Sequence, residues 1–474
     1  MKFIGRKASF PPLGLLTVAA MLPVEWGMRL VDMNVHHLTD ADLGWADYVF
    51  ISAMTVQRES VREVIDRCHR LGVKIVAGGP LFTSYQDDFP EVDHLVLGEA
   101  ELTLPRFLED LGKGEPRRLY EVERWADLRD TPIPLWGLID VGNYAAMNIQ
   151  YCRGCPYDCE FCDITVLFGR RPRSKTTGQL IAELDSLYHR GWRGAIFFVD
   201  DNFIGDKGKL KREVLPAIIE WMERKEYPFY FYTEASVDLS DDSRLMELMV
   251  RAGFEEVFIG IETPYEGSHL ESGKAPNRNR DLVASVQRIQ RAGLQVHGGF
   301  IVGFDSDPPS IFDKQIRFIQ ECGIVTAMVG LLSAMRGTRL YHRLAREGRL
   351  LGDASGNNTA LDLNFVPRMK REALLAGYRT ILETIYLPKN YYQRVIRLLS
   401  EYRPMHLGKY HLQPGYLGAL VKAVLFLGVI GRERFHFWKL FFWALFRKPR
   451  LFPLAITYAI YGFHFRKVAE KLRE

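Results

Sequence analysis

Apolar residues in the first 125 positions come in short runs that alternate with helical patterns. The runs at 29–32, 48–52, 74–77 and 94–97 have the length and composition of buried strands. Between two of them, residues 56–71 place apolar side chains at helical spacing. This alternation predicts a βαβ series that forms an open parallel sheet.

A longer and more regular alternation fills residues 146 to about 340. Six apolar runs are separated by segments of helix length, at 146–151, 195–199, 229–232, 256–261, 295–302 and 324–331. Six βα repeats predict a parallel sheet curled into a partial (β/α)6 barrel. Active residues of such a barrel lie on the loops after the strands.

The pattern divides the α/β chain into four parts. We expect an open-sheet domain at 1–125, a Pro-containing linker at 126–145, the barrel at 146–360 and a helical region at 361–474. The apolar run 13–22 follows basic residues, as in a secretory signal, but Pro11 and Pro12 stand at its start. We therefore expect a helix of a cytoplasmic α/β domain there.

Composition excludes several classes of protein. Apolar residues make up 47% of the chain and charged residues 25%, with 62 basic against 58 acidic side chains, which argues against disorder and against a nucleic-acid-binding polycation. Residues 404–474, however, carry twelve Lys or Arg and only three Glu. These aromatic-rich, basic helices fit either an ordinary domain packed on the barrel or peripheral contact with the inner face of the cytoplasmic membrane.

Four of the six cysteines lie within eleven residues, which points to a metal in a reducing compartment rather than to disulfides. Cys155, Cys159 and Cys162 supply three thiolates on one loop, enough for three corners of an iron–sulfur cubane whose fourth iron stays open. A structural zinc normally uses two separated cysteine pairs. Cys152 lies at a strand end, and we interpret it as a bystander.

Polar residues follow the other barrel strands as well. Asp200 and Asp201 follow the second strand, Glu234 and Ser236 the third, Glu262 the fourth, and Asp305 the fifth. Each alone could be a helix cap. Together, at one end of one barrel, they predict a binding site.

The cysteine loop, with Phe161 before its last cysteine, resembles that of the radical S-adenosylmethionine enzymes. The open-sheet domain with Gly78-Gly79-Pro80 and Gly98-Glu99, together with segments 199–203 and 260–263, is similar to the cobalamin-binding branch of that superfamily. Segments 10–15, 159–163 and 198–205 resemble the hopanoid C-2 methylases and their relatives. The resemblance covers most of the chain.

This resemblance implies three cofactors. Cys155, Cys159 and Cys162 would hold a [4Fe–4S] cluster, whose open iron would chelate S-adenosylmethionine and cleave it to a 5′-deoxyadenosyl radical. Methylcobalamin would then supply a methyl group to the activated carbon. Phe161 would lie against the adenine, other contacts to S-adenosylmethionine would come from Asp200, Glu234, Ser236 and Glu262, and cobalamin would meet Ser52, Gly78, Gly79, Gly98 and Glu99.

One departure from the family pattern concerns the open sheet. Only ten residues precede Pro11, so the first strand, which is interior in the flavodoxin-like order, is expected to be lacking. Either the start codon lies upstream, or the domain is reduced and binds cobalamin poorly or not at all.

We therefore predict C-methylation of a lipid or isoprenoid-like substrate, with an external one-electron donor and no nucleic-acid partner. Alternatives are a cobalamin-independent radical dehydrogenation, cyclisation or rearrangement, and a non-catalytic iron–sulfur electron-transfer or scaffold protein. Met335 and Arg336, after the sixth strand, are candidates for substrate selection; no single catalytic residue can be named.

Overall fold

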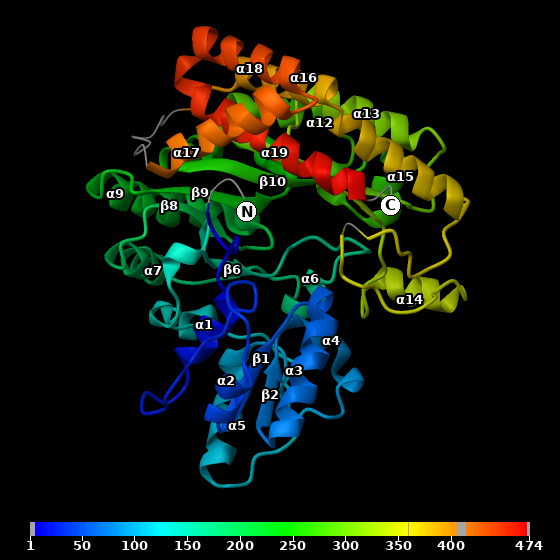
Figure 1. Cartoon of the computed structure of the whole chain (residues 1–474). Helices are drawn as coiled ribbons and strands as arrows, with labels where there is room; N and C mark the ends of the chain where they lie inside the picture. Colours follow the sequence, from blue (N-terminus) through cyan, green and yellow to red (C-terminus); the bar gives the residue numbers. More distant parts are fainter. Residues whose placement is uncertain (1–4, 359, 405–413, 472–474) are drawn as a thin grey trace. The chain divides into compact units, whose positions relative to one another are not determined.

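The computed structural model describes residues 5–358, 360–404 and 414–471, and the chain divides into two compact units (Figure 1). The N-terminal unit holds residues 6–201 and 333–357. Of the described residues, the C-terminal unit holds 5, 202–332, 358, 360–404 and 414–471. Both units combine parallel strands with covering helices, which confirms the α/β class.

The first sheet of the N-terminal unit has four parallel strands in chain order: β1 (Tyr48–Ser52), β2 (Lys74–Gly78), β3 (His94–Val96) and β4 (Leu119–Tyr120). Its helices are α1 (Leu13–Ala19), α2 (Asp40–Trp45), α3 (Arg58–Leu71), α4 (Pro80–Tyr85) and α5 (Ala100–Gly112). Apolar clusters lie on both faces of the sheet, one with α2, α3 and α4 and the other with α1 and α5. Burial on both faces explains why the strands read as continuous apolar runs.

Helix α3 shows how the sequence pattern becomes packing. Val61, Val64, Ile65 and Cys68 recur at helical spacing and are all buried. The helix ends at Gly72, whose φ of 67° is the left-handed conformation that glycine adopts without strain.

The expected strand at 29–32 is wrong. These residues form no strand; they lead into a turn in which Asp32 accepts hydrogen bonds from the backbone and the side chain of Asn34. In the flavodoxin-like order this run would pair only with the interior first strand, and no strand precedes β1 among residues 5–47. A strand without a pairing neighbour has nowhere to place its backbone hydrogen bonds. The short strand β4 was not predicted.

The rest of the N-terminal unit carries the first two barrel strands. Strand β5 (Met147–Ile149) pairs in parallel with β8 (Gly194–Phe198), and β6 (Cys152–Arg153) pairs antiparallel with β7 (Arg173–Ser174). The helices here are α6 (Ile164–Phe168), α7 (Thr177–His189) and α14 (Arg339–Arg346). The expected linker contains three 3₁₀ turns, η3 (Leu128–Asp130), η4 (Trp136–Leu138) and η5 (Val141–Asn143).

The C-terminal unit carries the other four barrel strands. Strands β9 (Phe229–Ala235), β10 (Phe254–Glu262), β11 (Gln295–Val302) and β12 (Ala327–Leu331) are parallel and pair in chain order. Each of the six predicted barrel runs therefore contains a strand. Helix α9 (Leu215–Arg224) precedes β9, and the helices between these strands include α10 (Ser243–Arg251), α11 (Glu266–Ser272), α12 (Leu282–Arg291) and α13 (Ile311–Cys322).

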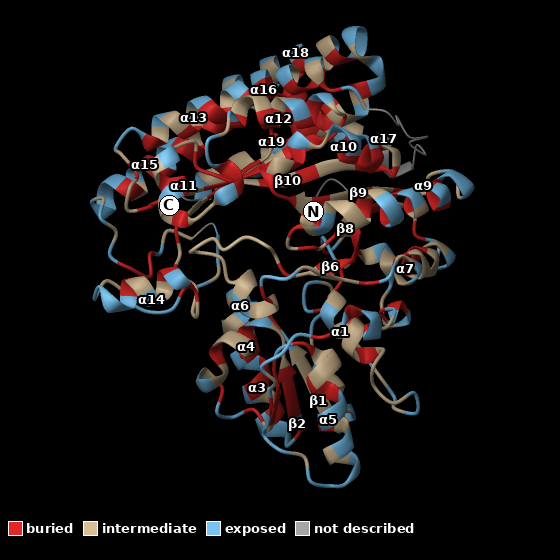
Figure 2. Cartoon of the chain, turned by 180° about the vertical axis from the view of Figure 1, so that it is seen from behind, coloured by how far each residue is buried: buried red, intermediate tan, exposed pale blue. Residues whose placement is uncertain are grey.

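Helices replace strands after β12, as predicted. They are α15 (Arg371–Tyr386), α16 (Pro388–Glu401), α17 (Pro414–Ala423), the π-helical segment η10 (Val424–Ile430), α18 (Arg434–Arg447) and α19 (Phe452–Lys471). Helix α19 reaches the start of β11, where the hydroxyl of Tyr458 donates to Gln295 Oε1 at 2.5 Å. Figure 2 shows buried and exposed stripes along these helices. Within the described ranges, no helix is both long and apolar enough to cross a bilayer.

Candidate cofactor site

The three candidate cluster ligands lie on one loop between β6 and α6. Cys155, Cys159 and Cys162 are each half-buried. The loop closes on itself, because the Cys162 amide donates to the Cys159 carbonyl (3.2 Å) and the Cys155 amide to the Gly169 carbonyl (3.3 Å). At Gly154, φ is 91° and an added Cβ would lie 2.9–3.0 Å from three carbonyl oxygens, so only glycine fits.

Asp200 and Asp201 anchor the beginning of this loop. One oxygen of Asp200 accepts from the amides of Tyr151 (2.8 Å) and Cys152 (2.6 Å), and Asp201 accepts from the Gly154 amide (2.8 Å). Burial raises the pKa of Asp200 to about 8 and that of Asp201 to about 6. The predicted S-adenosylmethionine contact Asp200 is thus first of all a support for the cysteine loop.

Cys152 differs from the other three cysteines. It is buried on β6, and burial together with the nearby Asp200 and Asp201 raises the pKa of its thiol well above the usual value. A thiol held neutral is a poor metal ligand, because ligation requires the thiolate.

Two carboxylates bind the loop to the first sheet. Arg153, next to Cys152, binds Glu99 (2.9 Å) and Glu101 (2.8 Å), and Arg173 binds Glu99 as well (2.8 Å). Glu99 also accepts from the Ala126 amide at 2.6 Å. The Glu99 side chain, predicted as a cobalamin contact, is therefore engaged with the cysteine loop.

The other predicted cobalamin residues gather at the carboxyl ends of β1, β2 and β3. A Cβ on Gly79, which has φ 85°, would lie 2.6 Å from Ser52 Oγ, and one on Gly78 would lie 2.6 Å from the Val96 carbonyl. Gly98 has φ 72° and open space where a Cβ would stand. Such a rim lets a large planar cofactor approach the backbone closely, so these residues fit cobalamin.

In the C-terminal unit, Glu262 ends β10 in a strained conformation. It is a buried non-glycine residue with φ 60°, at a register shift between β10 and β11. Its carboxylate lies over Gly260 and pairs with Lys274 at 2.7 Å. Strain retained at a buried acid is typical of functional sites.

Ser236 and Glu234 lie at the end of the neighbouring strand. Ser236 is buried and exchanges two hydrogen bonds with Asn202, at 3.2 and 3.3 Å. Glu234 lies on β9 in register with Phe258 of β10. The structure thus places the predicted residues in two sets: the cysteine loop, Phe161 and Asp200 in the N-terminal unit, and Glu234, Ser236 and Glu262 in the C-terminal unit.

Three thiols on one loop match in number the ligands of a [4Fe–4S] cluster that keeps one iron open. Among the described residues, no three His, Cys, Asp or Glu side chains converge closely enough to hold one metal ion. A cubane does not need such convergence, since each cysteine binds a different iron.

The segment 333–357, which we call the strap, supports the loop from another side. Arg343 of α14 binds Glu160, between two of the cysteines, at 2.6 Å, and the Leu340 amide donates to the Glu160 carbonyl at 2.9 Å. Arg339 donates to the Asp158 carbonyl at 2.6 Å. Sequence reasoning missed these partners, because they are about 180 residues from the loop.

Arg336, predicted to select substrate, is held within the same unit. Its guanidinium lies 4.4 Å from the ring centre of Tyr85 and pairs with Asp353 at 2.6 Å. Arg58 lies over the same ring, at 4.2 Å, and pairs with Asp88 at 2.5 Å. Arg336 therefore ties the strap to α4 of the first sheet.

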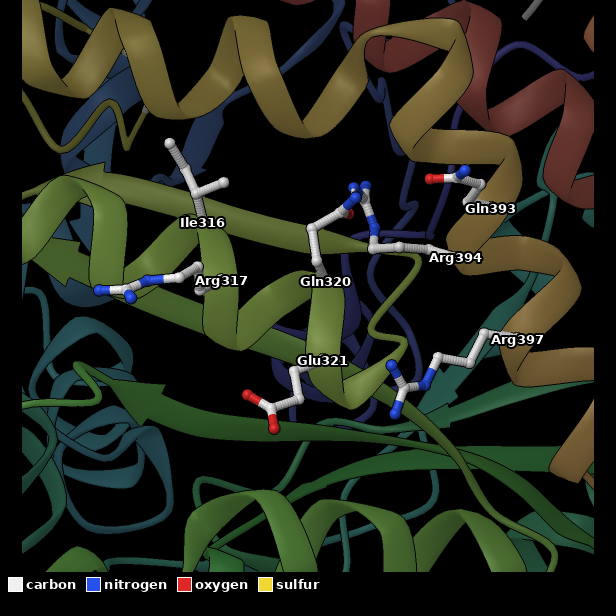
Figure 3. A pocket seen from close by; sticks show the side chains of 7 residues that line it. All are labelled: Ile316, Arg317, Gln320, Glu321, Gln393, Arg394 and Arg397. Atoms are coloured by element: carbon white, nitrogen blue, oxygen red, sulfur yellow. Dashed lines mark hydrogen bonds between the residues drawn. The ribbon is translucent and has the colours of Figure 1, made fainter.

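A pocket on the C-terminal unit lies apart from the predicted site residues. Figure 3 shows it between α13 and α16, with Arg394 reaching Gln320. Arg394 is wholly buried, and burial lowers its pKa to about 10. None of the predicted site residues lines this pocket.

Family models match three stretches of the chain. A B12 binding domain matches residues 4–108, the Radical SAM superfamily matches residues 149–332, and a domain of unknown function, DUF4070, matches residues 338–474.

Relatives match over nearly the whole length. An uncharacterized methyltransferase of Synechocystis sp. is 41% identical over 100% of this chain and 89% of its own. The hopanoid C-2 methylase of Rhodopseudomonas palustris is 33% identical over 91% of this chain and 83% of its own.

A solved structure shares the fold. The cobalamin-dependent S-adenosylmethionine radical enzyme OxsB superimposes with a TM-score of 0.66 at 15% identity, covering 98% of this chain and 82% of that one. This superposition confirms the open sheet and the partial barrel. The matches to the B12 binding domain and to the Radical SAM superfamily confirm the expected [4Fe–4S], S-adenosylmethionine and cobalamin cofactors. The chain belongs to the cobalamin-dependent radical S-adenosylmethionine methyltransferases, the family of the hopanoid C-2 methylase.

Proposed function

We propose that this enzyme methylates an unactivated carbon of a polycyclic or isoprenoid-like lipid. The observation that carries the proposal is the 33% identity to a hopanoid C-2 methylase over 91% of this chain and 83% of that enzyme. The apolar, basic character of those helices supports a substrate that resides in a membrane.

We propose that Cys155, Cys159 and Cys162 hold the cluster and that Cys152 does not. When bound, the cluster and cobalamin supply the electron that cleaves S-adenosylmethionine and the methyl group that is transferred. Asp200 and Asp201 hold the beginning of this loop through the amides of Cys152 and Gly154.

Four further side chains are proposed to bind S-adenosylmethionine. Phe161 offers a ring for the adenine, and the buried Ser236 offers a hydroxyl. Glu234 and Glu262 offer carboxylates that suit the amino group or the ribose hydroxyls. Lys274 holds Glu262 in place at 2.7 Å and thereby orients it.

For cobalamin we propose the backbone rim of Ser52, Gly78, Gly79 and Gly98. Glu99 would act indirectly, because its carboxylate already binds Arg153, Arg173 and the Ala126 amide.

The test is anaerobic purification with hydroxocobalamin, followed by iron and corrinoid analysis and incubation with a polycyclic lipid. We expect about four irons per chain for a [4Fe–4S] cluster, a corrinoid spectrum that survives desalting, 5′-deoxyadenosine, and a product heavier by one methylene. The variant C159A should lose the cluster and the product. If both cofactors are bound and 5′-deoxyadenosine forms but the lipid gains no methyl group, the proposed lipid substrate is contradicted.

We also propose a cytoplasmic enzyme that draws this substrate from the inner face of the cytoplasmic membrane. Residues 404–474 would make the peripheral contact, and an external one-electron donor would reduce the cluster. The net charge of +9 in this region supports attraction to an anionic leaflet.

A further inference from the structure

Helix α17, η10 and α18 carry apolar side chains on two faces. One face is buried through residues such as Ala423, Leu427, Phe437 and Leu440. The other, which we call the α17–α18 face, exposes ten large apolar side chains: Leu417, Val421, Leu425, Phe426, Val429, Ile430, Phe435, Phe442, Leu445 and Phe446. Helices that are apolar on every side belong in a core or at a membrane.

The exposed side chains are arranged in rows. Along α17 and η10 they recur every four residues from Leu417 to Val429, so they share one side of the helix. On α18, the rings of Trp438, Phe442 and Phe446 stack in sequence, with centroids 5.5 and 6.2 Å apart and interplanar angles of 22° and 12°. Phe435 and Phe446 are each 76% exposed.

The charges around this face have one sign. In the fully described stretch 417–450, the exposed charged residues are all basic: Lys422, Arg432, Arg434, Lys439, Arg447 and Arg450. The acidic residue of the stretch, Glu433, is buried and bound to Arg466.

We infer that the α17–α18 face inserts into the interfacial layer of a membrane leaflet that contains anionic lipids. The apolar side chains would be buried among the lipid chains, and the basic side chains would bind the lipid phosphates. A second copy of the chain is a poorer occupant, because a self-complementary contact would bring like charges together. This inference rests on the proposed function, because a lipid substrate is the reason for the enzyme to bind a membrane.

Flotation of the cofactor-loaded, full-length protein tests this surface. Vesicles of phosphatidylcholine are compared with vesicles that also contain phosphatidylglycerol, at low and high salt. We expect at least tenfold stronger binding to the anionic vesicles, weakened by salt. The double variant F435S/F446S should bind at least tenfold more weakly, because both rings are exposed and removing them leaves the core intact.

Two further variants separate the contributions. V24S, which changes a side chain that is 96% exposed in the N-terminal unit, is the matched control and should bind like wild type. The triple variant K439Q/R447Q/R450Q, which keeps Lys422, Arg432 and Arg434, should show a smaller preference for the anionic vesicles than the wild type. Circular dichroism and 5′-deoxyadenosine formation, expected at wild-type levels in every variant, show that each is folded.

The inference is overturned if the wild type stays with the soluble fraction at low salt, binds neutral vesicles as well as anionic ones, or forms dimers that F435S/F446S abolishes. Failure of the proposed substrate looks different. The protein would then bind anionic vesicles through this face but transfer no methyl group to a polycyclic lipid.

Discussion

At the scale of single residues, the carboxyl group of Asp200 acts as a clamp that holds the backbone at the beginning of the cysteine loop. One carboxyl oxygen accepts hydrogen bonds from the amides of Tyr151 and Cys152, just before the cysteine loop, at 2.8 and 2.6 Å. With its pKa raised to about 8, the group is mainly protonated at neutral pH, and a protonated carboxyl keeps a carbonyl oxygen that can accept both.

The variant D200A should therefore lose its cluster. Two buried amides without an acceptor cost about 2–6 kcal/mol of stability, so iron per chain after anaerobic reconstitution should fall by more than half. D200N keeps a carbonyl oxygen and should retain wild-type iron. Equal iron in D200A and wild type would show that the clamp is dispensable.

Asp307, in the loop after β11, predicts a pH dependence. It accepts from Ser268 and from the Gly303 and Phe304 amides, and burial raises its pKa from 3.8 to about 6. Between pH 3.8 and about 6, the Asp307 carboxyl is therefore mainly protonated in the folded protein and mainly ionised in the unfolded chain. This stabilisation is complete below about pH 4 and is lost as the pH rises through 6.

Relative to D307N, the wild type should lose about 3 kcal/mol of unfolding free energy between pH 4 and 7. Urea unfolding of both proteins at several pH values measures the difference. A difference that stays constant over this range would contradict the raised pKa.

At the scale of elements, helix α14 sets the charge beside the cluster loop. Arg343 neutralises Glu160, whose side chain is only 13% exposed, between Cys159 and Phe161. Local net charge is one of the factors that set the reduction potential of an iron–sulfur cluster.

R343Q should lower the reduction potential of the cluster, since it leaves a carboxylate without its cation, and E160Q should raise it. Shifts on the order of tens of millivolts are expected, with R343Q/E160Q between them. A redox titration followed by electron paramagnetic resonance measures all three. Identical potentials would show that the pair has only a mechanical role.

The sequence predicts elements better than it predicts their partners. Apolar patterning located the half-buried β1 and the largely buried β11 to the residue, because each strand coincides with a local apolar run. It failed at 29–32, since a strand also needs a neighbour. Lys274, Arg153 and Arg343 escaped notice for a related reason: their partners come from other segments, and only folding brings them together. The roles of the predicted ligands stay predictions.

At the scale of the whole molecule, Glu99 and Glu101 join the first sheet to the cysteine loop through Arg153. A ligand that stabilises the first sheet should therefore also stabilise the cysteine loop, and a ligand of the loop should stabilise the sheet to the same extent. Cobalamin and the cluster should therefore bind cooperatively.

Cobalamin should bind at least fivefold more tightly to cluster-loaded protein than to C155A/C159A/C162A, within the usual range of coupling. When the same comparison is made with R153Q in both proteins, the ratio should fall towards one. Titration followed by corrinoid absorbance gives both constants. A ratio of one in the wild type would mean that the two cofactors bind independently.

The path of the chain between the units has a practical consequence for building hybrids. The chain leaves the C-terminal unit after Leu332 and returns at Asn358, having placed Arg343 beside Glu160 on the way. A hybrid in which all residues after β12 come from a relative would keep the cysteine loop of this chain but take the strap, residues 333–357, from the relative. An exchange of the C-terminal helices between relatives should therefore be made after residue 358, because a crossover there leaves the cysteine loop and its strap partners from one parent.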